Sequence, residues 1–459
     1  MSLSFLAWGA GAALSFSVGV VLVKVAALFG DAGAPLIVGL AIFAAVTGLL
    51  LAAPIVGVLA VLATFPVGSV PVPGLPLSVS EAAVLYAATL VALRQLAIAR
   101  RPFGWAPPMW WAMALLVWVA VVVSSAIDVA LATKQLAALG GGIAFASLVL
   151  SSSDRTADVR HALLGFVVVA TAVVASGFTS GVSFASVAGG TTVGGRLTGA
   201  LDHPNQLGSL CALAIPIGVA LALSPVGAAI RGFSAIAVLT LLAGLALSLS
   251  RGAWIGTAGA AVFLLLRMPE ARRALLAAGI PLGIAAALFW SSTSTSTELQ
   301  VVGERARAIA VLSPYDGRAE VYREALREIR ENPFSGVGPA NFSVSSVRSA
   351  SHASTVAAHH AHNLFLNWGA ESGLPAVGAI LGFIFAIALA SMGALRASRR
   401  FGLAEERILT LGLCASLLAL LGQSLVDYTL RNTVVHLSVW FVVGALLAMP
   451  GIVARSSPS

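Results

Sequence analysis

The chain has 459 residues, of which 59% are hydrophobic and only 10% are charged, and its mean hydropathy is +0.98. This composition excludes an ordinary soluble domain, in which about 25% of the residues are charged. The net charge of +8 does not indicate a nucleic-acid partner, because the basic residues lie in short loops without interleaved aromatic residues. The two cysteines, Cys211 and Cys414, lie in apolar segments and give neither a disulfide framework nor a metal motif.

Apolar runs of about 20 residues recur from residue 5 to residue 453, and each could cross roughly 30 Å of hydrocarbon as a helix. The sequence therefore predicts an all-α polytopic membrane protein with about 12–14 transmembrane helices and one large extracytoplasmic loop containing amphipathic helices. The first run, 5–29, is predicted to be a retained helix, because it lacks the flanks of a signal peptide. Residues 34–67 form either one long helix or two short helices hinged near Pro54, so the total is 13 or 14.

The later helices divide the chain into three regions. They are predicted at 80–99, 107–127, 133–151, 158–177, 206–224, 231–250, 252–267, 273–290, 373–395, 405–425 and 432–453. The regions are the N-terminal transmembrane helices (1–290), an extracytoplasmic loop (291–359) with a helix at 317–332, and the C-terminal transmembrane helices (360–459).

Orientation follows from the basic residues, which accumulate in cytoplasmic loops. One set of loops and the C-terminus hold fourteen of the 26 Lys and Arg residues; these loops are 94–104, 154–161, 225–231, 267–273 and 395–407. The short loops opposite hold four: Lys134, Arg196, Arg251 and Arg431. The long loop shares this second face, which is therefore predicted to be extracytoplasmic.

Two arginines on that face precede predicted spans. The segment GGRLTGALDHPNQLGS contains Arg196, Asp202, His203 and Asn205, and its Gly and Pro residues allow a turn or a re-entrant segment that lines a polar cavity. In SLSRGAWIG, Arg251 lies in a tight turn between two spans. Its charge is explained either by snorkelling from a helix end or by an anionic ligand.

The long loop concentrates charge: residues 298–331 hold thirteen of the 44 charged side chains. The stretch DGRAEVYREALREIRENP predicts an amphipathic surface helix that Asp316 caps. Its apolar positions are Ala319, Tyr322, Leu326 and Ile329. The later arginines of this helix are interpreted as solvated or paired with glutamates. Arg318 lies in the first turn, where free N–H groups favour an anion such as phosphate. Arginine pairs well with phosphate oxygens, and the three arginines Arg196, Arg251 and Arg318 therefore predict a pyrophosphate ligand.

The stretch AHHAHNLFLNWGAESGLP, residues 358–375, holds three of the seven histidines. On a helix, His359, Asn363, Asn367 and Glu371 would form one polar stripe. Three interpretations compete for the histidines: a metal site, for which the ligand spacing is poor; a structural cap; and a general base, which we favour for His362 because imidazole titrates near neutral pH.

These residues resemble the O-antigen ligase and polymerase superfamily of bacterial inner-membrane glycosyltransferases. The resemblance rests on many spans, the SRGA turn, a late external loop with "GR" at the head of a helix, "NPFSGVGPANF" and "HAHNLFLNWGAESGLPA". The chain has one or two more N-terminal spans than the usual ligase.

The resemblance implies transfer of a glycan from undecaprenyl pyrophosphate to lipid A-core or another hydroxyl acceptor. The reaction would invert the anomeric carbon and use no metal, nucleotide or other cofactor. Arg251 and Arg318 would hold the pyrophosphate with Arg196, and His362 would activate the acceptor with His360 nearby. Asn363, Glu371, His203 and Asn205 would support the site. The protein would lie in the bacterial inner membrane among its lipids, with its active site on the periplasmic face.

Three activities within the superfamily fit this sequence: surface-polysaccharide ligase, repeat-unit polymerase and protein O-glycosylating ligase. The single long loop favours a ligase. A lipid-glycan flippase or transporter is the alternative from another class, and it would carry charges near the bilayer midplane and broken helices in paired halves.

Overall fold

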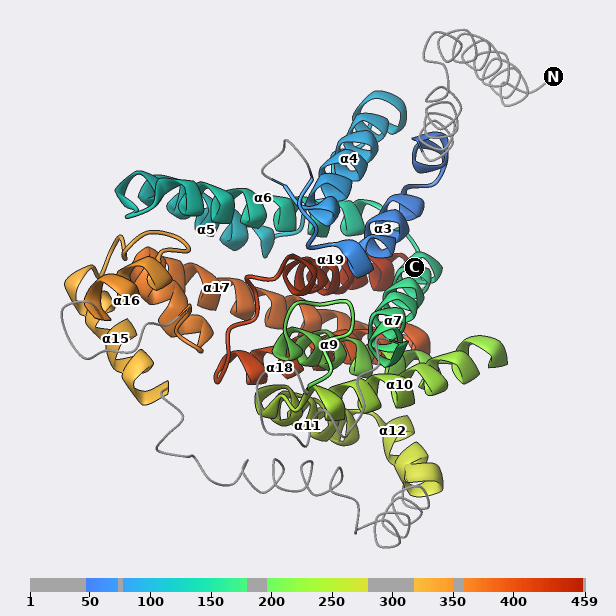
Figure 1. Cartoon of the computed structure of the whole chain (residues 1–459). Coiled ribbons are helices and arrows are strands. Elements are labelled where there is room, and N and C mark those ends of the chain that lie inside the picture. Colours follow the sequence, from blue (N-terminus) through green and yellow to red (C-terminus); the bar gives the residue numbers. More distant parts are fainter. Residues whose placement is uncertain (1–46, 73–76, 180–195, 280–317, 351–358, 457–459) are drawn as a thin grey trace, which may run out of the picture.

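The computed structural model describes residues 47–72, 77–179, 196–279, 318–350 and 359–456. Apart from turns and one isolated bridge between Pro71 and Ser78, the secondary structure of these residues is helical (Figure 1), which confirms the all-α class. Four predicted features lie outside the described residues: the run 5–29, the first part of 34–67, the cap Asp316 and residues 280–290.

Eight helices in the described part of the chain are long and apolar enough to cross a membrane. They are α4 with its continuation η3 (Val79–Leu93 and Arg94–Ala99), α6 (Val129–Ser151), α7 (Thr156–Thr179), α9 (Pro204–Leu223), α10 (Ala228–Ser248), α17 (Leu364–Arg400), α18 (Ala404–Ser424) and α19 (Thr433–Ser456). Two shorter apolar helices are α3 (Pro54–Ala63), continued by η2 (Phe65–Val67), and α5 (Met109–Val122), continued by η4 (Val123–Ser125). The chain is thus a multi-pass membrane protein.

A ninth span would combine α11 (Arg251–Arg267) and α12 (Pro269–Ala274), which are bent by 105° and followed by η6 (Leu275–Gly279). The sequence prediction started this later helix at residue 273, which is wrong. The helix begins at Pro269, because proline fits the first helical position and cannot continue the preceding helix. Near the N-terminus of the described chain, the hinge expected at Pro54 is present: Ala53 has extended backbone angles (φ −135°, ψ 101°) between helical residues 47–52 and α3.

Ion pairs join the predicted cytoplasmic loops at one end of the bundle. The guanidinium of Arg160 lies 2.8 Å from a carboxylate oxygen of Glu405, and that of Arg407 lies 2.6 Å from Glu270. We call this the basic end. The opposite end, at which α9, α11, α17 and α19 begin, is called the site end.

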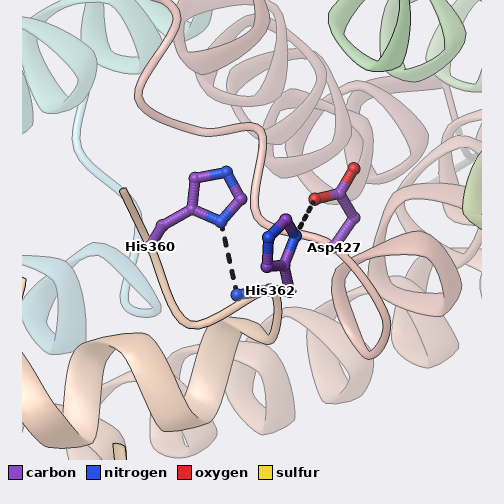
Figure 2. Close-up of side chains that lie close together, drawn as sticks. All are labelled: His360, His362 and Asp427. Atoms are coloured by element: carbon purple, nitrogen blue, oxygen red, sulfur yellow. Dashed lines mark hydrogen bonds and ion pairs between the residues drawn. The ribbon is translucent and has the colours of Figure 1, made fainter. Parts of the chain in front are cut away.

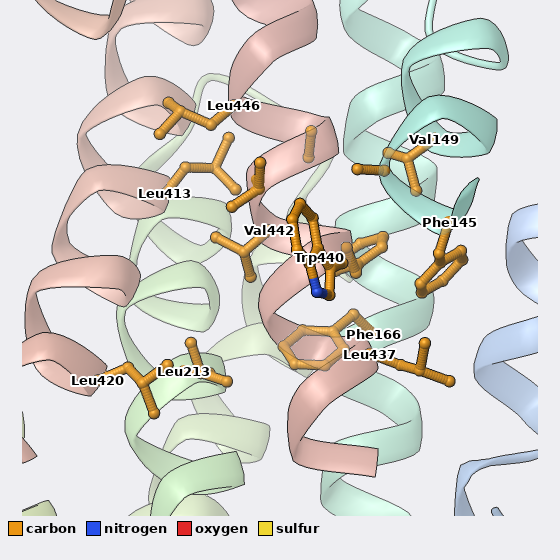
Figure 3. Packing of buried hydrophobic residues seen from close by; sticks show 14 of the residues in the cluster. Phe145, Val149, Phe166, Leu213, Leu413, Leu420, Leu437, Trp440, Val442 and Leu446 are labelled. Atoms are coloured by element: carbon orange, nitrogen blue, oxygen red, sulfur yellow. The ribbon is translucent and has the colours of Figure 1, made fainter. Parts of the chain in front are cut away.

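The centre of the bundle consists of α9, α18 and α19, the most buried of the spans. Figure 3 shows how aromatic and branched side chains of several helices interlock there. The rings of Phe166 and Phe441 lie 5.0 Å apart between centroids. Small residues bring other helices closer: a Cβ on Gly256 of α11 would lie 2.0 Å from the carbonyl oxygen of Ala419 in α18. Such packing is typical of membrane helices, which gain little from hydrophobic burial in lipid.

A break in α17 anchors the external helices α15 (Arg318–Glu331) and α16 (Phe342–Ala350). The break is at Gly373, whose φ of 76° and ψ of 177° are not helical. The turn after α15 fills it: the N–H of Leu374 donates to the carbonyl of Pro333 at 2.8 Å, and a Cβ on Gly373 would lie 1.8 Å from the carbonyl oxygen of Phe334. The external helices therefore pack against the first turns of α17 at the site end (Figure 1).

The buried face of α15 differs from the predicted one. Leu326 is 42% exposed and Ala319 is exposed, whereas Val321 and Ala325 pack against α16 and α17. Two glutamates on the same face are buried because they have partners: Glu328 accepts a hydrogen bond from Ser345 and, like Glu324, pairs with Arg327. Apolar periodicity alone therefore predicted only part of this face: Ile329 packs against it and Tyr322 is half-buried, but the buried glutamates were taken as solvent-facing.

Candidate active site

The histidine stretch is a turn that ends where α17 begins. Asn363 is the N-cap of α17, and its side-chain oxygen accepts hydrogen bonds from the N–H groups of Phe365 and Leu366 at 2.9 and 3.0 Å. The predicted polar stripe from residue 359 is therefore wrong in its first half, because His359 precedes the helix and only Asn367 and Glu371 lie within it. The predicted span at 373–395 corresponds to the part of α17 after the break.

His362 has a left-handed backbone conformation, with φ of 48°. Histidine is one of the few residues that adopt this conformation with some frequency, but it still costs free energy relative to a glycine. The turn is fixed by two contacts: the N–H of His362 donates to Nδ1 of His360 at 3.3 Å, and the hydroxyl of Tyr322 in α15 donates to the carbonyl of His362 at 3.4 Å. The imidazole is thus presented at the site end by a constrained turn.

The ring of His362 faces Asp427, which lies between α18 and α19 (Figure 2). The imidazole Nδ1 is 3.1 Å from Oδ1 of Asp427, and the side chains are 32% and 4% exposed respectively. An ionised carboxylate can only accept hydrogen bonds, so Nδ1 of His362 is the donor. In the neutral ring, Nε2 is then the basic nitrogen.

The second oxygen of Asp427 extends the network to α9. It accepts a hydrogen bond from the side-chain amide of Asn205 at 2.7 Å. The amide oxygen of Asn205 in turn accepts from Arg196 at 2.6 Å, and Nε of Arg196 donates to the carbonyl of Ser248 at 2.8 Å. The segment before α9, α9 itself and the end of α10 are thus joined by hydrogen bonds to the loop before α19, which carries Asp427. This chain of bonds fixes the carboxylate that faces His362.

Two predicted supporting residues also cap helices. The ring of His203 is the N-cap of α9, where Nδ1 accepts a hydrogen bond from the N–H of Asn205 at 3.1 Å. The side-chain amide of Asn363 donates to the carbonyl of Leu425 at 2.9 Å, so the cap of α17 also holds the segment that leads to Asp427. The structural-cap interpretation is therefore correct for Asn363.

Burial and neighbouring charges decide the protonation states. Burial by itself would raise the pKa of the Asp427 carboxyl, but the hydrogen bond from His362, the nearby imidazoles and the backbone N–H of Tyr428 outweigh burial and lower that pKa. Burial, and then repulsion by His362, lowers the pKa of His360 to about 3. Burial and the charge of Arg196 lower the pKa of His203. At neutral pH the site thus holds one ionised carboxylate beside neutral imidazoles of His360 and His203.

Glu371 pairs with Arg431, a residue that the sequence prediction used only for topology. The guanidinium of Arg431 contacts the Glu371 carboxylate, which is 3% exposed, and also donates to the carbonyl of His359 at 2.6 Å. The same carboxylate accepts a hydrogen bond from the N–H of Phe342 at 3.3 Å. Arg431 therefore ties the histidine turn, α16 and α17 together.

The remaining predicted arginines begin helices at the site end. Arg318 is the first residue of α15, one turn before Tyr322, whose hydroxyl contacts His362. Arg251 is the first residue of α11, and the next residue packs closely against α18: a Cβ on Gly252 would lie 2.9 Å from Val426. The structure brings the starts of both helices to the end that holds His362 and Asp427.

An apolar cavity of about 460 Å³ leads from the bundle interior to this end. It runs between α17, α18 and α19, from Arg267 at the basic end to Leu364 and Tyr428 at the site end. Tyr428 follows Asp427 in the chain, and its ring centroid is 6.0 Å from that of His360. The cavity therefore ends beside the histidines.

Comparison with known families decides the identity of this region. Residues 236–381 match the model of a family described as O-Antigen ligase. This region resembles an O-antigen ligase domain. The match confirms the resemblance predicted from the histidine stretch, and it supports, in general terms, a membrane glycosyltransferase of the ligase or polymerase type that acts on a lipid-linked glycan. No curated protein matches the chain.

The ligase domain does not contain the whole network. It includes Arg251, Arg318, His360, His362 and Glu371. Arg196, Asn205 and Asp427 lie outside the match. Segments on either side of the matched region therefore supply the groups that hold the imidazole of His362.

Sequence reasoning missed Asp427 and the pairing role of Arg431. A signal was present in SLVDYTLRN, where a carboxylate lies in a short connection between two apolar spans; a charge so close to hydrocarbon is a candidate functional residue by default. The partner, however, is 65 residues away in the sequence, and no local spacing relates the two.

Within the described part of the chain, His360, His362 and Asp427 form one group whose ligand atoms lie within 4.8 Å of one another, as a metal site would require. One ring nitrogen of each histidine already has a protein partner: Nδ1 of His360 accepts from the N–H of His362, and Nδ1 of His362 pairs with Asp427. These three side chains therefore fit hydrogen bonding at least as well as they fit metal coordination.

Proposed function

We propose that the protein transfers a glycan from undecaprenyl pyrophosphate to an acceptor hydroxyl, such as one on lipid A-core, at the periplasmic face of the bacterial inner membrane. The observation that carries the proposal is the pair of His362 and buried Asp427 at the end of an apolar cavity, at the same end of the bundle as two helices that begin with arginine. The donor's chain would occupy the cavity, and its glycan would project towards the imidazole.

His362 is the general base in this proposal. Nε2 takes the proton of the acceptor hydroxyl as the oxygen forms a bond to the anomeric carbon. Asp427 is a positioning residue, because its hydrogen bond fixes the ring and its charge favours the imidazolium that forms. His360 supports the turn and, with a pKa near 3, stays neutral during the reaction.

The leaving group is undecaprenyl pyrophosphate, which departs as the bond between the anomeric carbon and its phosphate oxygen breaks. Attack from the opposite side of the sugar inverts the anomeric centre. Because pyrophosphate is a good leaving group, the enzyme mainly has to orient the reactants and neutralise the growing negative charge. Arg251 and Arg318 are assigned to that charge. Arg196 already donates to Asn205 and Ser248, so its first role is to hold the network, with the pyrophosphate as a second partner.

The proposed reaction uses no metal and no other cofactor. Loss of transfer on addition of a chelator, with recovery on addition of zinc, would contradict this and would favour ion binding by His360, His362 and Asp427. Among related activities, the fate of the glycan in a deletion strain separates ligase from polymerase and protein ligase. Loss of capped lipid A-core supports the first, short chains the second and an unmodified protein acceptor the third.

The decisive experiment compares His362→Ala with His161→Ala in purified, membrane-reconstituted protein. His161 is an exposed histidine in α7 near the basic end, so it is a matched control. We expect the first variant to bind donor and to lose transfer, and the second to retain transfer. Arg251→Ala and Arg318→Ala should weaken binding of undecaprenyl pyrophosphate. Normal transfer by folded His362→Ala protein would refute the base, and unaltered donor binding would remove both arginines from the site.

A further inference from the structure

A second hollow, of about 220 Å³, lies beside the site end and plays no part in the reaction described above. Its polar lining comes from four separate elements: Glu81 of α4, Lys134 and Gln135 of α6, Ser343 of α16, and Arg431 and Thr433 around the start of α19. One water takes up about 30 Å³ in the liquid, so the hollow has room for a group the size of a sugar substituent.

The charged side chains of this hollow differ in their partners. The Glu81 carboxylate accepts hydrogen bonds from the N–H and the hydroxyl of Ser78, both at 2.8 Å, and the Arg431 guanidinium is paired with Glu371. Lys134 is exposed, and no hydrogen bond or ion pair joins it to another of the described residues. The neutral donors of Ser78 do not cancel the charge of Glu81, so this lining carries one carboxylate and one ammonium group that form no ion pair among the described residues. The ammonium of Lys134 can therefore form a charge-assisted hydrogen bond with an anionic group.

The hollow adjoins the candidate active site through shared residues. Leu430 and His436 line both this hollow and the apolar cavity, and Arg431 contacts the hollow on one side and the carbonyl of His359 on the other. A molecule held here would thus lie next to the histidine turn, on the side of α4 and α6. The donor is assigned to the apolar cavity, which leaves this position for the other reactant.

We propose that this hollow is the acceptor subsite and that Lys134 recognises an anionic substituent, a phosphate or a carboxylate, on the acceptor glycan. The inference rests on the proposed function for the identity of the reactant, but binding at the hollow needs no transfer. Hydroxyl and amide groups of Ser343, Thr433 and Gln135 would contact the sugar ring, as is usual for small polar pockets. A charge-assisted hydrogen bond to Lys134 would add about tenfold in affinity.

Saturation-transfer NMR tests the subsite in reconstituted protein, with glucose 6-phosphate and glucose as probes and inorganic phosphate as a competitor. We expect ring protons of glucose 6-phosphate to receive saturation, with about tenfold weaker binding in Lys134→Ala. Ser343→Leu, which fills the hollow without changing its charge, should also reduce binding of glucose 6-phosphate. Arg273→Ala is the matched control, because it removes one exposed positive charge at the basic end and should change nothing.

Three outcomes would overturn the inference. Equal binding of glucose and glucose 6-phosphate would remove the role of the charge. Displacement of glucose 6-phosphate by inorganic phosphate at the same concentration would show that the sugar ring adds nothing to binding, and the hollow would be a simple anion site. Unchanged binding in both Lys134→Ala and Ser343→Leu would show that the probe binds at another place on the protein. Measuring the same signal in His362→Ala separates this inference from the proposed function. If His362→Ala loses transfer and still binds glucose 6-phosphate, binding at the hollow is independent of the base; if the parent protein transfers glycan but does not bind the probe, only this inference fails.

Discussion

The imidazole of His362 and the carboxylate of Asp427 lie 3.1 Å apart, although 65 residues separate them in the chain. The carboxylate is almost fully buried and has a hydrogen-bond donor at each oxygen. Such an arrangement fixes which nitrogen of the ring carries a proton, and so determines whether the other nitrogen can act as a base.

Asp427→Asn should therefore reduce the turnover number by on the order of 10²- to 10⁴-fold with little change in the KM for the donor, because the amide can stabilise the wrong tautomer. Asp202→Asn is the control; Asp202 is exposed at the same end and accepts one hydrogen bond, from Asn432. Equal activity of both variants would show that Asp427 is only structural.

Acid should destabilise the protein through His360. Its pKa is about 3 in the folded protein and 6.5 in the unfolded chain, so the unfolded state binds the extra proton first. The stabilising contribution of the neutral ring is complete above pH 6.5 and is lost as the pH falls towards 3. The pKa of Asp427 is lowered from 3.8, so its contribution is lost only below that pH. Unfolding temperatures between pH 7 and pH 4 should fall less in His360→Gln than in the parent, and parallel curves would contradict this.

Gly373→Ala should lower the free energy of unfolding by at least about 2 kcal/mol, because a side chain would strain a positive φ and collide with the carbonyl of Phe334. Gly378→Ala is the matched control in the same helix: its added Cβ meets nothing within 4 Å, and alanine there should be neutral or stabilising by up to about 1 kcal/mol. Denaturant unfolding measures both. Proteolysis near residues 331–338 should increase only in the first variant.

Filling the apolar cavity should impair use of long-chain donors. Ile384 lines the cavity, whereas its neighbour Phe385 is 64% exposed on the outer face of α17. We expect Ile384→Trp to raise the KM for an undecaprenyl donor about tenfold and to leave the KM for a short-chain analogue unchanged, and Phe385→Trp to alter neither. If chain length makes no difference to the effect of Ile384→Trp, the cavity is not the path of the lipid.

The parts of this structure that could be predicted are those that local pattern determines. The length of the apolar runs predicted the positions of most spans. The distribution of basic residues assigned several loops to one face, and ion pairs join some of these loops at one end of the bundle. His362 stood out because histidines are scarce in this chain. By contrast, the left-handed turn at His362 depends on a contact with α15, and the partner of Asn205 depends on how α9 and α18 pack. Neither packing arrangement is encoded in residue spacing, so both required the fold.

The network that holds His362 has a consequence for how the protein can be divided. The matched region, 236–381, supplies the imidazole, while the carboxylate that orients it and the amide behind that carboxylate come from sequence on opposite sides of the region. A polypeptide limited to the matched region would keep the histidine motif but lack the carboxylate and the amide that orient its imidazole, and we expect it to be inactive. Activity should instead return when two separately expressed parts of the protein reassemble in one membrane and together supply Asn205, His362 and Asp427.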